Sequence, residues 1–446
     1  MLLAGLEPIP AYRRQACYPN LTMIEKLTQI WKTKDLRNNI LIVLGMLAIF
    51  RFLAHIPIPG VDLAALKKFF QSNQLFGLVN IFSGGTMENF SIVMLGVAPY
   101  ITSSIIFQLL TMIIPKLEEL SKEGEYGQKK INMYTRWLTV PLGGLQAFGM
   151  INILNQSSRQ IFGALTPFRY VTMMLTITAG TILLMWIGEL ISERKIGNGI
   201  SLLIFAGIVA SLPKTVQQAI LTFDPSQIFN LIIFAVIAVV TIAAVVIITE
   251  GQRNIPVSYA RQVRGMKMYG GVNTHLPLRV NMAGVIPIIF AISLILFPPM
   301  IARFFVAAKS AWIAAAAQWT VDIFQNTLIY GMMYFVLVVA FTYFYTAVIF
   351  HPDKIADNLQ KQGGFVPGIR PGRPTAEYLQ YVTRRIILAG ALFLGIIAIL
   401  PLVVQSFTGG GSLVIGGTSL LIVVSVVIET VKQVESQMTM REYEGY

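Results

Sequence analysis

Apolar residues occur along most of the chain in long runs that short polar segments separate. Ten of these runs approach 20 residues, which is the length at which an α-helix crosses the hydrocarbon core of a bilayer. They cover approximately residues 38–56, 92–114, 137–155, 170–188, 200–220, 228–249, 281–301, 323–350, 386–405 and 413–431. No series of short alternating strands favours a barrel. The pattern predicts an all-α polytopic membrane protein with ten transmembrane helices.

The second and seventh runs carry the same interruption near their starts. Gly96-Val97-Ala98-Pro99 lies in one, and Gly284-Val285-Ile286-Pro287 lies in the other. Proline removes a backbone donor and kinks a helix, and matching Gly/Pro breaks in two halves indicate the working site of an inverted repeat. We therefore predict two pseudo-symmetric, inverted halves of five helices, 23–227 and 228–446, after a disordered leader at 1–22.

Composition and charge agree with a membrane protein of defined orientation. Only 12% of residues are charged and 55% are hydrophobic, which excludes an ordinary soluble domain. When the loops and tails are assigned to alternate sides, 26 of the 34 Lys and Arg residues lie on one side. The positive-inside rule then predicts that both termini are in the cytoplasm. Cys17 is the single cysteine, so the chain forms no internal disulfide.

The predicted outer segment 57–91 contains a short amphipathic helix. Asp62 is a plausible N-cap for it. The apolar positions that follow at helical spacing are Leu63, Leu66, Phe69 and Phe70. The helix is too short to span a bilayer, so it either lies on the outer surface or caps a cavity as a re-entrant segment. A second outer helix is predicted within 303–321.

Two large inner loops, 250–280 and 351–384, are rich in cations. The second is dense in Gly and Pro between residues 363 and 374, which indicates turns that hold a stiff tip. The cations of interest are Arg261, Arg264, Lys267, Arg370 and Arg373. Either these residues serve membrane topology alone, or they bind an acidic partner, a protein or nucleic acid phosphate.

The chain lacks the motifs of several enzyme classes. It contains no G-x-x-x-x-G-K-[ST] loop for a nucleotide and no H-E-x-x-H motif, and its three histidines are scattered. We therefore expect no enzyme activity, no cofactor and no metal site. A secondary solute transporter would need ionisable residues at mid-membrane, and Arg51, Glu189 and Asp322 instead lie near span ends, where they can reach water. A purely structural scaffold would have no use for the two broken spans.

Aliphatic and amide side chains occupy the middle of several spans. Val97, Ile101 and Ile105 recur at i, i+4 and i+8 in the second run, and Ile200 and Ile204 repeat this spacing in the fifth. Such residues normally only pack against neighbouring helices. Two amides near helix ends, Gln108 and Asn198, either bond to each other or cap their own backbones.

Several longer motifs resemble one known family. They include Ile56-Pro57-Ile58-Pro59-Gly60, Gly197-Asn198-Gly199-Ile200-Ser201, Asn281 to Pro287, Phe365 to Gly372, and Gly416 to Ile422. These motifs follow one another in the order found in that family. Over about residues 23–440, the chain resembles the SecY/Sec61-alpha family of protein-conducting channels. The resemblance implies an hourglass pore between the two halves, in the cytoplasmic membrane.

The resemblance also implies a role for each group of residues. The pore ring would consist of Val97, Ile101, Ile105, Ile200, Ile204, Ile286 and Ile422. The plug would be the segment 61–76, and the lateral gate would include Pro99, Gln108, Asn198 and Pro287. Arg370 would be the main docking contact for the energy source.

The implied partners belong to the same transport system. They are the SecE and SecG subunits, the SecA motor ATPase, and the ribosome with its RNA, together with SecDF and YidC. The implied substrates are unfolded preproteins with their signal peptides, and transmembrane segments that leave sideways into membrane lipid.

Overall fold

The computed structural model describes residues 31–72, 83–155, 161–162, 166–221, 228–259, 262–264, 267–269, 273–306, 310–408 and 417–444. The predicted leader 1–22 lies outside these residues. A helix occupies each of the ten predicted spans: α2 (Lys34–Leu53), α5 (Ala98–Ile113), α7 (Glu125–Asn155), α8 (Pro167–Glu193), α9 (Gly199–Leu221), α10 (Ile228–Glu250), α11 (Ile286–Phe305), α13 (Thr327–Ile349), α15 (Arg373–Thr408) and α16 (Gly417–Glu444).

Length and apolar composition together are a test for membrane-spanning helices. Five described helices pass that test alone, and α5 passes it together with α6 (Pro115–Lys122), from which it is bent by 102°. The helices α9, α10 and α11 are 23, 23 and 20 residues long, which is enough to cross the hydrocarbon core of a bilayer.

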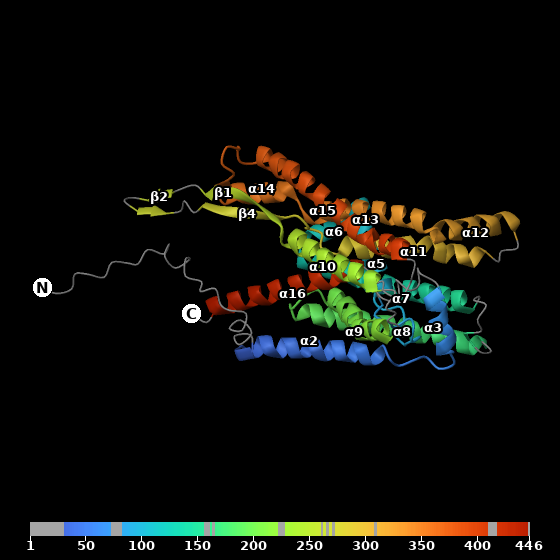
Figure 1. The fold of residues 1–446 in the computed structure, drawn as a ribbon. Helices are drawn as coiled ribbons and strands as arrows, with labels where there is room; N and C mark the ends of the chain where they lie inside the picture. The colour runs from blue at the N-terminus through green and yellow to red at the C-terminus, as the bar shows by residue number, and fades with distance from the viewer. Residues whose placement is uncertain are drawn as a thin grey trace.

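The predicted outer and inner segments lie at opposite ends of the helix bundle (Figure 1). The short helices α3 (Leu63–Ser72) and α12 (Ala311–Gln325) lie at one end. The C-terminus of α16, the helix α14 (Pro352–Lys361) and the strands lie at the other. This arrangement agrees with the sides that the charge pattern predicted for these segments.

The two inner loops form a small sheet that the sequence analysis did not predict. β1 (Gln252–Tyr259) pairs antiparallel with β4 (Asn273–Arg279), and β5 (Gly364–Phe365) adds to its other edge, with Ser258 opposite Phe365. Alternate residues of β1 are buried, as one face of a strand requires. Between β1 and β4, a hairpin of β2 (Gln262–Arg264) and β3 (Lys267–Tyr269) extends outward (Figure 1). The sheet joins two loops that lie far apart in sequence.

The Gly/Pro motifs of the second and seventh spans mark where helices begin, and the prediction of kinks within these spans was wrong. Gly96 and Gly284 have φ of 58° and 62°, which L-residues rarely adopt, and a helix starts two residues later in each case. Pro99 and Pro287 fall in the first turn, where proline costs no hydrogen bond. A β-carbon at either glycine would meet no atom closer than 4.0 Å, so the backbone angle, and not crowding, requires glycine.

Two clusters of buried apolar side chains stabilise the bundle. The central cluster draws residues from helices of both predicted halves, from Val43 in α2 to Val426 in α16. Among the described residues, the outer cluster draws on positions between Ile58 and Ile177, from α3, the segment before α5, α7, residues 161–162 and α8. Its described members therefore all belong to the predicted N-terminal half.

Candidate functional site

A cavity of about 770 Å³ lies among α5, α7, α8, α9 and α11. Ile101, Ile200 and Ile286 line its apolar part. Its polar wall includes Ser104 and Gln108 within α5. The other polar residues lie in segments that the sequence predicted to be cytoplasmic: Lys129, Asn132, Arg136, Glu189, Ser192, Glu193 and Asn198. The cavity is thus polar toward one membrane surface and aliphatic toward the middle of the bundle.

The structure gathers all seven residues of the predicted ring into the central cluster. The buried members are Val97, Ile101, Ile105, Ile204 and Ile422, and the members that pack against them while partly buried are Ile200 and Ile286. They come from four helices: α5 with the residue before it, α9, α11 and α16. Two of these elements belong to each predicted half, so the cluster spans the boundary between the halves.

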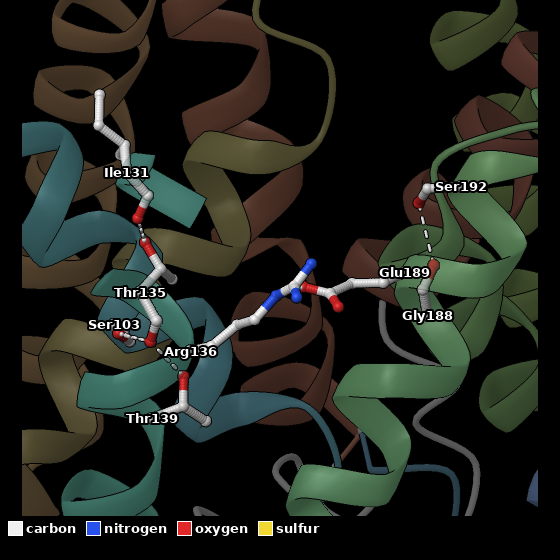
Figure 2. A network of polar contacts seen from close by, with 8 residues as sticks. All are labelled: Ser103, Ile131, Thr135, Arg136, Thr139, Gly188, Glu189 and Ser192. Carbon is white, nitrogen blue, oxygen red and sulfur yellow. Dashed lines mark hydrogen bonds and ion pairs between the residues drawn. The ribbon is translucent and has the colours of Figure 1, made fainter. Parts of the chain in front are cut away.

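A network of polar contacts supports one wall of the cavity (Figure 2). Arg136 Nε on α7 lies 2.7 Å from Glu189 Oε1 on α8, and the two side chains extend toward each other from the two helices. Ser103 Oγ on α5 donates to the Thr135 carbonyl at 2.7 Å, and Thr139 Oγ donates to the same oxygen. The network therefore connects α5, α7 and α8 on one side of the cavity.

Comparison with known proteins identifies the family. The SecY family model matches residues 91–431 of the chain. The chain belongs to the SecY family. It is 43% identical to the protein translocase subunit SecY of Mycobacterium tuberculosis over 95% of this chain and 100% of the relative, and 44% identical, with the same coverage, to that of Streptomyces coelicolor. The chain is a multi-pass protein of the cytoplasmic membrane and the protein-conducting channel subunit of the Sec translocase, and not an enzyme.

Solved structures support the fold. A structure described as that of a protein conducting channel matches with a TM-score of 0.60 at 17% identity, covering 94% of each chain. Sec61 in the canine ribosome-channel complex matches with a TM-score of 0.56 at 18% identity, also covering 94% of each chain. The prediction of ten transmembrane helices is confirmed, and the small sheet of the inner loops adds to the all-α description.

The predicted gate residues of this SecY family member lie in or next to three helices: Pro99 and Gln108 in α5, Pro287 in α11, and Asn198 just before α9. Pro99 and Pro287 are buried at the starts of α5 and α11. Asn198 Oδ1 accepts hydrogen bonds from the amides of Ile200 and Ser201, so it caps α9. Of the two possibilities for the amides, the structure therefore shows Asn198 capping its own backbone.

Gln108, the other amide, is held within its own helix. Its Nε2 donates to Ser104 Oγ at 3.3 Å, and its Oε1 is buried with no hydrogen-bond partner among the described residues. Both amides still line the same cavity.

The predicted plug helix is present as α3, and residues 73–76 of the plug segment lie outside the described residues. Asp62 Oδ1 accepts from the amides of Ala64 and Ala65, which confirms it as the helix cap. Leu66, Phe69 and Phe70 are buried in the outer cluster, and Leu63 packs against it. The helix therefore packs into the protein at the outer ends of α7 and α8, and its described apolar side chains belong to the outer cluster, whereas the ring residues belong to the central one.

The predicted docking residues divide into three groups. Arg261 lies outside the described residues, and Arg264 and Lys267 face each other in register at the end of the β2–β3 hairpin. Arg370 is exposed on a turn between Gly368 and Gly372, whose φ angles are 85° and 93°.

Arg373 is not on the loop tip, where the sequence analysis placed it, but begins α15. There its Nε lies 3.3 Å from Glu377 Oε1, in an i,i+4 ion pair. Arg370 forms no such ion pair with any described residue. The two arginines are only three residues apart, but one is on an exposed turn and the other is ion-paired at the start of a helix.

Sequence reasoning found the two amides of the polar wall and missed its charged residues. Arg51 and Glu189 were expected to reach water, but Arg51 Nη1 donates to the Gly84 carbonyl at 2.7 Å and Glu189 pairs with Arg136. The Arg136–Glu189 ion pair could have been predicted from the sequence. Arg136 immediately precedes one predicted span and Glu189 immediately follows the next, so antiparallel neighbours bring the two opposite charges to the same membrane surface.

Proposed function

We propose that unfolded polypeptides cross the membrane through the ring of seven aliphatic residues. The observation that carries this proposal is that these side chains, from both predicted halves, belong to one apolar cluster beside a cavity of about 770 Å³. A narrow apolar ring resists water and ions by dewetting, yet it forms no hydrogen bond with a passing peptide. The ring thus acts as a seal that tolerates any sequence.

Sideways release of transmembrane segments would occur between α5 and α11. These helices pack against each other, belong to different halves and begin at the same Gly/Pro motif. Separation of the halves, 23–227 and 228–446, would open this seam toward lipid. An apolar segment gains roughly 0.3–0.6 kcal/mol per Leu or Ile on transfer into the membrane, which provides the driving force.

The energy for transport would come from a partner, because the sequence contains no nucleotide-binding loop. The inner sheet and the Arg370 turn present cations on the cytoplasmic side, where SecA or the ribosome would dock. Sec61, which shares the fold, was solved in a canine ribosome-channel complex. SecE and SecG are the proposed companion subunits, and SecDF and YidC are further proposed partners. The helix α3 would act as the plug that covers the outer funnel.

The seal can be tested by electrical recording. Ile101→Gly combined with Ile200→Gly removes two side chains from the ring, and the resting ion conductance of the reconstituted translocase in planar bilayers should rise. Leu44→Gly with Ile49→Gly is the matched control, because both side chains are exposed on α2. A ring variant that conducts no more than this control would contradict the proposal.

A further inference from the structure

The Arg136–Glu189 pair joins two helices at the cavity wall. The Glu189 side chain is only 17% exposed, whereas Arg136 is 50% exposed, so the carboxylate depends on its partner more than the guanidinium does. No other ion pair to Glu189 occurs among the described residues. A carboxylate that is mostly removed from water is costly when it is left unpaired.

On the α7 side, the backbone and one buried hydrogen bond connect the pair to α5, which carries ring residues. Arg136 follows Thr135, whose carbonyl accepts the hydrogen bond from Ser103. This bond is buried and joins α7 to α5. Ser103 lies between Ile101 and Ile105, so the bond fixes the part of α5 that carries ring residues.

On the α8 side, the connection is made by close packing. Glu189 follows Gly188, and a β-carbon at Gly188 would lie 3.0 Å from Cδ1 of Ile200. A β-carbon at Gly199 would lie only 1.8 Å from the Gly188 carbonyl oxygen, so the backbones of α8 and the start of α9 touch. Gly199 also donates from its amide to Ser192 Oγ at 2.9 Å. Ile200 is therefore packed closely against the end of α8.

We infer that the Arg136–Glu189 pair is a strut that keeps the resting ring closed. The pair closes a path of contacts from Ile101 and Ile105 on α5 to Ile200 on α9, so it fixes the distance between the two ring segments of the N-terminal half. Both residues are positioning residues that act through the ring, and the inference rests on the proposed function of that ring as a seal.

The test is a set of charge variants recorded in planar bilayers without substrate. Glu189→Gln keeps the size of the side chain and removes its charge, and Arg136→Gln does the same for the partner. Each should raise the ratio of open to closed channels roughly fivefold or more, as expected for the loss of a partly buried pair. Arg136→Glu combined with Glu189→Arg should return the conductance toward that of the parent protein.

The charge exchange distinguishes a strut from two residues with separate roles. If the exchanged protein conducts as much as the single variants, the pair is not a strut and the inference fails. If Glu189→Gln conducts no more than Lys122→Ala, which breaks an exposed ion pair on α6, the inference also fails. Should a neutral variant not fold, Arg136→Lys keeps the charge and must then show an intermediate conductance.

The ring variants separate this inference from the proposed function. If Ile101→Gly with Ile200→Gly conducts ions while Glu189→Gln does not, the seal stands and only the strut is rejected. If the ring variants do not conduct, the proposed function itself is contradicted. Detergent-extracted protein should show similar melting temperatures for the single and exchanged variants, so a general loss of stability does not explain the conductance.

Discussion

The central and outer apolar clusters are built from different parts of the chain. The central cluster contains the ring and takes residues from both halves, whereas the outer cluster contains the α3 contacts and takes residues from one half. Movement of the halves relative to each other therefore disrupts the central cluster and leaves the outer one intact. Under the proposed function, opening of the ring and displacement of α3 would therefore be separable events.

A cross-link between the halves should have the largest effect on transport. Cysteines at Ser104 on α5 and Ile289 on α11 line the same cavity, and Cys17 can be replaced because it is the single native thiol. A short reducible bridge between them should abolish passage of a secreted substrate, because the central cluster can no longer open. Transport should return on reduction.

Each single-cysteine variant, treated with the same reagent, is the control for obstruction of the cavity. Full transport with the bridge in place would show that the two halves need not separate there.

Charge reversal at the inner turn should have the next largest effect. Arg370→Glu should reduce substrate translocation by about tenfold, a change typical of an interfacial charge contact. Arg373→Glu is the matched comparison and should do less, because Arg373 already pairs with Glu377 at the start of α15. The measurement is translocation and motor ATP hydrolysis with inverted vesicles. Equal, mild losses at both positions would mean that the loop contributes only diffuse positive charge.

Deletion of the plug should give a smaller effect on the seal. Without residues 62–71, the outer cluster loses Leu66, Phe69 and Phe70, while the ring remains complete. The protein should insert normally and show a raised resting conductance that stays below that of the ring variants. Failure of insertion would show that α3 is a structural part of the N-terminal half.

Replacing the glycines at the starts of α5 and α11 by alanine should have the smallest effect, and the two variants should lose similar stability. Gly96→Ala and Gly284→Ala should each cost about 1 kcal/mol of stability, because alanine is strained at positive φ while the sites themselves are open. Gly45→Ala in α2 meets open space at ordinary helical angles, and it should be neutral or stabilising. Melting temperatures in detergent would reveal any difference between the two halves.

The sequence predicted the parts of the fold that depend on the bilayer. Ten apolar runs are visible because each membrane helix must be apolar over about 20 residues. The inner sheet was not visible, because β5 contributes only Gly364 and Phe365 and pairs with a strand about 100 residues earlier. Pairing at such a distance leaves little pattern in a two-residue strand.

The same reasoning explains which site residues could be found. The helical spacing of Val97, Ile101 and Ile105 predicted one shared face, and the structure places them in one cluster. Ile422 belongs to the same cluster because of how α16 packs against the other helices, and no local sequence pattern determines that packing. The resemblance to the family supplied Ile422 as a ring residue. The Arg136–Glu189 pair was missed because Arg136 was only counted among the cytoplasmic cations and Glu189 was considered alone at its span end.

The central claim is that the passing chain touches the ring from both halves at once. Cysteines at Ile101 and at Ile422, in separate variants lacking Cys17, can be tested for disulfide formation with a cysteine in a stalled secretory polypeptide. Our account predicts adducts at both positions and none at Ile151, which is buried in the outer cluster. Adducts at Ile151 with none at Ile101 or Ile422 would contradict it.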